Sequence, residues 1–142
     1  MNADVTLDKS VINQFGRFAI TGGIGFLVEA VVLTLLVSVS EMNVYFARSI
    51  SFSIAVTTTW LINRHFTFAG FQRKRKGKEY FLYFLVQTIG VLINLFVFFL
   101  VLSAYPELRS LVVIPLAAGS AVAMFFNFAA SRVWIYNKRG QR

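Results

Sequence analysis

The chain has 142 residues, of which 57% are hydrophobic, 16% aromatic and 14% charged, and its mean hydropathy is +0.68. Soluble domains contain roughly 45–50% apolar and about 25% charged residues, so this composition indicates a membrane protein. The absence of cysteine excludes disulfides, thiol catalysis and thiolate metal sites. The net charge of +8 would suit a nucleic-acid partner, but the positions of the charges argue against one.

Four apolar runs predict four transmembrane helices, because about 18 or more apolar residues suffice to cross a bilayer. We expect spans at residues 18–39, 44–63, 80–105 and 111–131, which together form one all-α transmembrane domain over residues 1–142. Ahead of the first span, the stretch LDKSVINQFGRF predicts a short interfacial helix capped by Asp8 or Ser10. The first run is longer than the about 7–15 apolar residues of a signal peptide, so we interpret it as a span.

Glu29 lies near the middle of the first span. An ionised carboxylate at that depth costs about 2.5–3.5 kcal/mol on insertion scales, so such residues usually serve a function. In one interpretation, Glu29 takes part in transport or ligand binding. In the other, it is a neutral packing residue bonded to a neighbouring helix, such as the one that bears Asn94. The sequence leaves both interpretations open.

The segment between the second and third spans, residues 64–79, is a basic loop. Its stretch RKRKGK should lie at the surface, where each basic residue near anionic lipid contributes about 1 kcal/mol of attraction. Gly70 and Gly77 argue against a rigid helix there. At the end of the third span, Pro106 predicts the helix terminus.

The basic residues fall almost entirely on one side of the four predicted spans. Twelve of the fourteen lie before the first span, in the middle loop or after the fourth span, and only Arg48 and Arg109 lie elsewhere. Short basic segments remain in the cytoplasm, so both termini and the middle loop should be cytoplasmic.

The two halves of the chain share a pattern that predicts a duplicated two-helix unit. Because each unit has two spans, both copies would enter the membrane in the same direction, as parallel repeats. At an offset of 65 the matching pairs are Gly22 with Gln87, Gly25 with Gly90, and Glu29 with Asn94. At an offset of 68 they are Arg64 with Arg132, Phe66 with Trp134, and Phe68 with Tyr136.

The repeated arginines are candidate ligands of a lipid phosphate. Arg64 and Arg132 each end a predicted span, and Arg17 leads into the first span from the same side. A guanidinium at headgroup depth can bind phosphate through two hydrogen bonds. Ordinary membrane anchoring beside an aromatic belt is the alternative, but the repetition favours a phosphate site. The expected interface aromatics are Phe66, Trp134 and Tyr136.

Polar side chains within the spans are candidates for a transport pathway, although most could equally be hydrogen bonds that hold helices together. The pathway candidates are Glu29, Gln87, Asn94 and Asn127, and Thr57 to Thr59 could bond across helices. Enzyme motifs are absent, so we expect no catalytic residue, no cofactor and no enzymatic activity. His65 is the single histidine, and we expect no metal site.

The chain resembles the GtrA-like family of small four-helix membrane proteins, over about residues 15–137. The resemblance lies in FGRFAITGGIGFLVEAVVLTLL, in LINRHFTF and in FFNFAASRVWIY, whose Asn-Phe-x-x-Ser-Arg-x-Trp at residues 127–134 is the most characteristic part. It implies a role with polyprenyl-phosphate-linked sugars in the cytoplasmic membrane of the cell envelope. The family pattern has an acidic or amide residue in the first helix, and Glu29 stands where an aspartate is more usual.

Three functions follow as hypotheses. The leading one is a flippase for polyprenyl phosphate, such as undecaprenyl phosphate, or for a monosaccharide linked to it, in polysaccharide biosynthesis. The second is a scaffold that recruits a glycosyltransferase partner through the basic loop. The third, a small multidrug proton antiporter, fits less well because those dimers need a weak charge bias. A homo-oligomer is compatible with the sequence.

Overall fold

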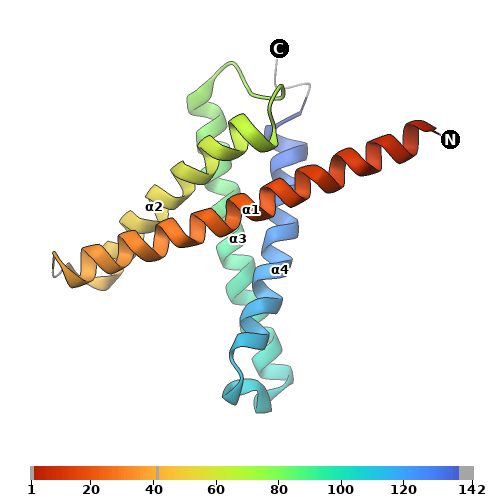
Figure 1. Ribbon diagram of the computed structural model, residues 1–142. Coiled ribbons are helices and arrows are strands. Elements are labelled where there is room, and N and C mark those ends of the chain that lie inside the picture. The colour runs from red at the N-terminus through yellow and green to blue at the C-terminus, as the bar shows by residue number, and fades with distance from the viewer. Residues whose placement is uncertain (1, 41, 138–142) are drawn as a thin grey trace. The chain divides into compact units, whose positions relative to one another are not determined.

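The computed structural model describes residues 2–40 and 42–137, with side chains from Ser10 onward, and this part of the chain is helical without strands. The chain divides into two compact units, one up to Lys74 and the other from Arg75. Each unit contains one antiparallel pair of long helices (Figure 1). The all-α class predicted from the sequence is confirmed.

The first unit contains α1 (Asn2–Ser38), α2 (Val44–Ile62) and a π-helical turn, η1 (Asn63–Thr67). The helix α1 is continuous through the stretch that we expected to form a separate interfacial helix. Asp8 and Ser10 therefore lie inside α1 and do not cap it. No proline interrupts residues 2–38, so nothing breaks the helix before the first span. The helix α2 does have a side-chain cap, since Asn43 accepts a 3.0 Å hydrogen bond from the Tyr45 N–H.

The second unit contains α3 (Lys76–Ala104), a 3₁₀ turn η2 (Pro106–Ser110), α4 (Val113–Ala130) and a π-helical turn η3 (Ser131–Ile135). The helix α3 starts within the segment predicted as a loop, and Gly77 lies in its first turn. The argument from Gly77 against a helix was therefore wrong. Pro106 follows the end of α3, as predicted.

In both units the helices approach closely along a stripe of small residues on the second helix. Buried residues recur every four positions on α2, and again on α4. Gly25 of α1 faces Thr59, and Gly90 of α3 faces the amide of Asn127, so closely that a Cβ atom at either glycine would collide with that side chain. The stripes comprise Ala47, Ser51, Ala55 and Thr59 on α2, and Pro115, Gly119 and Ala123 on α4.

Three helical segments, Ser10–Ser38, Lys76–Ala104 and Val113–Ile135, are long and apolar enough to cross a membrane. They make the chain a multi-pass membrane protein. The helix α2 has 19 residues but includes Arg48 and many hydroxyl side chains, which lower its hydropathy. That α2 is a fourth span, and that all helices form one domain, remain predictions.

Candidate functional site

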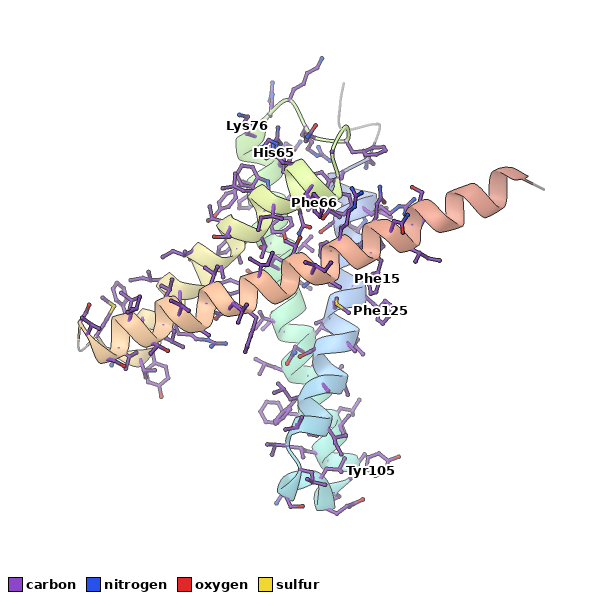
Figure 2. All side chains as sticks on the ribbon, viewed as in Figure 1. Phe15, His65, Phe66, Lys76, Tyr105 and Phe125 are labelled. Atoms are coloured by element: carbon purple, nitrogen blue, oxygen red, sulfur yellow. The ribbon has the colours of Figure 1, made fainter. Side chains whose placement is uncertain are left out.

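Arg17 connects α1 to the π turn η1. Its Nη1 donates a 3.2 Å hydrogen bond to the carbonyl oxygen of Phe66. The centre of the guanidinium lies 4.8 Å from the centroid of the Phe66 ring, a cation–π distance. Both side chains are exposed, and Figure 2 shows Phe66 beside α1. Arg17 is thus fixed at the first helical turn of the long apolar run while remaining accessible.

Arg64 lies in the same π turn, but its side chain is mostly covered. The residue is 8% exposed. Its Nη2 donates to the carbonyl of Arg73 at 3.4 Å, and its own carbonyl accepts a 3.0 Å bond from the Gln72 side chain. The guanidinium lies 5.9 Å from the centroid of the Trp60 ring. The sequence predicted Arg64 as a ligand of a lipid phosphate, and the structure shows its side chain covered by the connection that follows η1.

Arg132 occupies the corresponding position in η3 of the second unit. It is half-buried, and its Nη1 is shielded from solvent without a hydrogen-bond acceptor among the described residues. Ser131, immediately before it, is fully buried. The Arg132 guanidinium therefore has a hydrogen-bond donor inside the fold, where leaving a donor unpaired costs free energy.

The two π turns are built in the same way. The Phe68 N–H donates to the Asn63 carbonyl at 2.8 Å, and the Tyr136 N–H donates to the Ser131 carbonyl at 2.9 Å. In both turns an arginine follows the first residue. Single π turns are uncommon and frequently accompany functional sites. The recurrence at an offset of 68 was not predicted as a backbone feature, although the repeated arginines marked its position.

The predicted interface aromatics divide into two groups. Phe66 and Trp134 are 51% and 55% exposed, and Trp134 also packs edge-to-face on Phe126 at 6.2 Å. Tyr136 is only 3% exposed, so it is a core residue of its unit and not part of an exposed belt. Its counterpart Phe68 is likewise buried, against the edge of Phe18 at 6.3 Å.

Glu29 has a partner that the sequence analysis missed. Its Oε1 lies 3.4 Å from Nη1 of Arg48, and the two side chains are 19% and 63% exposed, respectively. The alignment does not make a hydrogen bond at Oε1, so the contact is an ion pair only. The sequence did contain a signal for this pair, because opposite charges occur in two consecutive apolar helices. Charges in such helices tend to pair with one another.

The amide residues of the second unit bond between α3 and α4. Asn127 Nδ2 donates to Gln87 Oε1 at 3.0 Å, and Asn94 Nδ2 donates to Ser120 Oγ at 2.9 Å. Asn127 Oδ1 is buried and accepts no hydrogen bond from the described residues. The structure therefore brings two pathway candidates together and gives both amide pairs a packing role. The described residues contain no group of three His, Cys, Asp or Glu side chains that could hold a metal ion.

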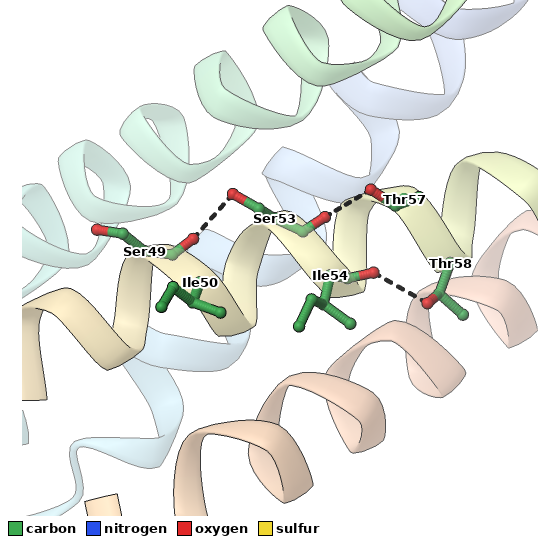
Figure 3. Close-up of a pocket in the computed structure, with 6 residues that line it drawn as sticks. All are labelled: Ser49, Ile50, Ser53, Ile54, Thr57 and Thr58. Carbon is green, nitrogen blue, oxygen red and sulfur yellow. Dashed lines mark hydrogen bonds between the residues drawn. The ribbon is translucent and has the colours of Figure 1, made fainter. Parts of the chain in front are cut away.

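An open groove of about 480 Å³ runs along one face of α2 and is lined by Ser49, Ile50, Ser53, Ile54, Thr57 and Thr58. Figure 3 shows that Thr57 and Thr58 donate to carbonyls one turn earlier, at 2.8 and 2.9 Å. These two hydroxyls thus bond back into their own helix. Ser53 does the same at 2.8 Å, so the groove offers little free donor capacity.

The family model of the GtrA/DPMS transmembrane domain matches residues 17–136. The chain belongs to this family. The GtrA/DPMS match begins at Arg17 and ends at Tyr136, so it includes both π turns and every candidate residue described above. No curated protein matches the chain. Family membership agrees with the resemblance found in the sequence and supports a membrane function related to polyprenyl-phosphate sugars.

Proposed function

We propose that this GtrA/DPMS protein carries polyprenyl phosphate, or a monosaccharide linked to it, across the cytoplasmic membrane for cell-surface polysaccharide glycosylation. The observation that supports this most is the recurrence of an arginine-bearing π turn at the end of the second helix in each unit. Arg64 and Arg132 occupy these turns, and Arg17 contacts the first of them. Each unit would bind lipid phosphate through its own arginines, because guanidinium groups suit phosphate oxygens.

The orientation follows from the charge bias. Both termini and the connection between the units lie in the cytoplasm in this proposal, with the two helix pairs as parallel repeats. The basic residues that support it include Lys138, Arg139 and Arg142, which lie outside the described residues, and Lys9, whose side chain is not described. Both π turns would then face the cytoplasmic leaflet, where the lipid phosphate enters.

Each unit has paired polar side chains on its apolar helices that could serve the passage of the headgroup. Glu29 with Arg48, and Gln87 with Asn127, are pairs that can separate and rebond to a ligand. Asn94 with Ser120 is a third such pair. The chain has no nucleotide-binding motif, so movement would be downhill or coupled to a proton, with Glu29 as the proton carrier. In this proposal the chain makes and breaks no covalent bond.

Lipid flipping in proteoliposomes tests this mechanism. Arg132→Ala should slow the flipping of polyprenyl phosphate by about tenfold or more, since a charge-assisted hydrogen bond contributes roughly 1.5–3 kcal/mol. Glu29→Gln should also slow it, because the amide cannot carry a proton. Wild-type rates in both variants would contradict the proposed roles, and unchanged thermal stability would show that lost activity is not lost folding.

One observation favours a second candidate function, a scaffold for a glycosyltransferase. Lys74, Arg75, Lys76 and Lys78 are all exposed and form a basic surface at the start of α3. In the scaffold hypothesis, replacing these four residues with Gln abolishes co-purification of the enzyme, whereas Glu29→Gln leaves it intact. The reverse result would argue against the scaffold.

A further inference from the structure

A polar hollow lies between α1 and η1, beside Arg17, and the roles described above do not use it. Its volume is about 330 Å³. In Figure 2, Phe66, one of its lining residues, lies next to α1. The lining side chains include Ser10, Asn13, Gln14, Arg17, Phe66 and Thr67. All of them belong to the first unit.

Four of these residues lie on one face of α1, because Ser10, Asn13, Gln14 and Arg17 are three, four and seven residues apart. At about 1.5 Å per residue, the two amides lie roughly 4.5–6 Å from Arg17 along the helix axis, and Ser10 lies roughly 10 Å from it. They extend away from the apolar run that starts at Phe18. A group attached to a phosphate held by Arg17 would therefore lie over these polar side chains.

Gln14 provides a separate indication of a ligand. Its Oε1 is shielded from solvent and accepts no hydrogen bond from the described residues. Buried amide oxygens are nearly always paired, so this acceptor suits a ligand that brings hydroxyl donors.

The charge of the hollow restricts the ligand further. Arg17 is the one charged side chain among its lining residues, and the other polar groups there are amides and hydroxyls. The Arg17 guanidinium uses Nη1 for Phe66 and has further N–H groups that can bind phosphate. A ligand with a single phosphate and uncharged hydroxyl groups next to it matches these side chains.

The second unit has no equivalent set. At the offset of 65, Ser10, Asn13, Gln14 and Arg17 correspond to Arg75, Lys78, Glu79 and Leu82. The set of uncharged amides and a hydroxyl is therefore specific to the first unit and is not required by the helix pairing that both units share.

We infer that this hollow binds the uncharged monosaccharide of a polyprenyl-phosphate sugar, while Arg17 binds the phosphate. The inference rests on the proposed function and adds to it the place where the headgroup is recognised. Sugar hydroxyls donate to Gln14 Oε1 and accept from the Asn13 amide. Free polyprenyl phosphate has no sugar hydroxyls and leaves the two amides unused.

Binding of two matched lipids to the full chain in nanodiscs tests this inference. The probes are a short-chain polyprenyl phosphate and the same lipid carrying a neutral hexose. The wild type should bind the hexose lipid about tenfold more tightly, because each neutral hydrogen bond contributes roughly a several-fold factor in affinity. The double variant Asn13→Ala/Gln14→Ala should lose this preference and keep its affinity for the sugar-free lipid. Ile12→Ala, at a 60% exposed position of the same helical turn, is the control and should behave as wild type.

The outcomes separate the inference from the function on which it rests. Equal affinity of the wild type for the two lipids, or an unchanged preference in the double variant, contradicts the sugar site alone. An equal loss of affinity for both lipids also contradicts it, since the amides would then support the phosphate. Binding of neither lipid by the wild type contradicts the proposed function and the inference together.

Discussion

Glu29 and Arg48 lie 3.4 Å apart, with the carboxylate 19% exposed and the arginine side chain 63% exposed. In an apolar surrounding, two opposite charges in contact cost much less than either charge alone. The pair accounts for how a carboxylate is accommodated near the middle of an apolar helix.

A double-mutant cycle measures this pair. Glu29→Gln leaves Arg48 without its counter-ion and should destabilise the protein by at most about 2–3 kcal/mol, since Arg48 is largely exposed. The double variant Glu29→Gln/Arg48→Gln should be less destabilised than the sum of the two single variants. Thermal unfolding in detergent, followed by tryptophan fluorescence, gives the values. Additive effects would show that the two side chains do not interact.

Gly25 and Gly22, both on α1, provide a test position and its control. A Cβ at Gly25 would collide with the Thr59 side chain, whereas a Cβ at Gly22 would have no atom within 4 Å. Gly25→Val should therefore lower the free energy of unfolding by about 1–3 kcal/mol through overpacking. Gly22→Val should lower it much less in the same unfolding experiment. Equal effects would mean that α1 and α2 are not in close contact at Gly25.

At the scale of elements, the two π turns share their backbone bonds but differ in their first side chain. Asn63 is 1% exposed, and its Oδ1 accepts a 2.6 Å hydrogen bond from the Thr67 hydroxyl. Ser131 is fully buried, and its hydroxyl has no hydrogen-bond partner among the described residues. The side chain of the first residue thus stabilises η1 through a hydrogen bond, whereas in η3 it does not.

This difference predicts opposite sensitivities to alanine. Asn63→Ala removes the acceptor of a buried hydroxyl and should cost about 1–3 kcal/mol in the free energy of unfolding. Ser131→Ala removes a buried unpaired hydroxyl and should be nearly neutral or slightly stabilising. Unfolding midpoints of the two variants check the contrast, and a larger cost at Ser131 would contradict the account.

The apolar runs were sufficient to predict where the long helices lie, because hydropathy over a span is a strong signal. The helix ends were not predictable from the same signal. The charged first turn of α3, with Lys76 and Lys78, reads as a loop in the sequence, yet Glu79 in that turn is fully buried in the fold. Tertiary packing of that kind determines where a helix begins, and the composition of the local sequence does not reveal it.

At the scale of the whole molecule, the sequence predicted where polar and basic side chains lie along the chain but not what they contact. The matched arginines marked the positions of both π turns, although the turns themselves were not predicted. Whether each guanidinium is covered, as in Arg64, or accessible, as in Arg17, depends on the loop and ring that pack on it. The pairing of Glu29 with Arg48 and the hollow beside Gln14 likewise required the contacts between helices.

The orientation in the membrane can be measured because the chain has no cysteine. The single variant Lys74→Cys should be labelled only by a membrane-impermeant reagent supplied on the cytoplasmic side. The single variant Ser110→Cys should be labelled only from the opposite side. Labelling of both positions from one side would contradict the topology that the charge bias predicts.

The central claim is that this chain moves the lipid phosphate without a partner enzyme. The most direct measurement is the initial rate at which polyprenyl phosphate crosses the bilayer of vesicles that contain only the purified wild-type protein. We predict a rate that rises in proportion to the amount of protein per vesicle. A rate equal to that of protein-free vesicles would contradict the claim.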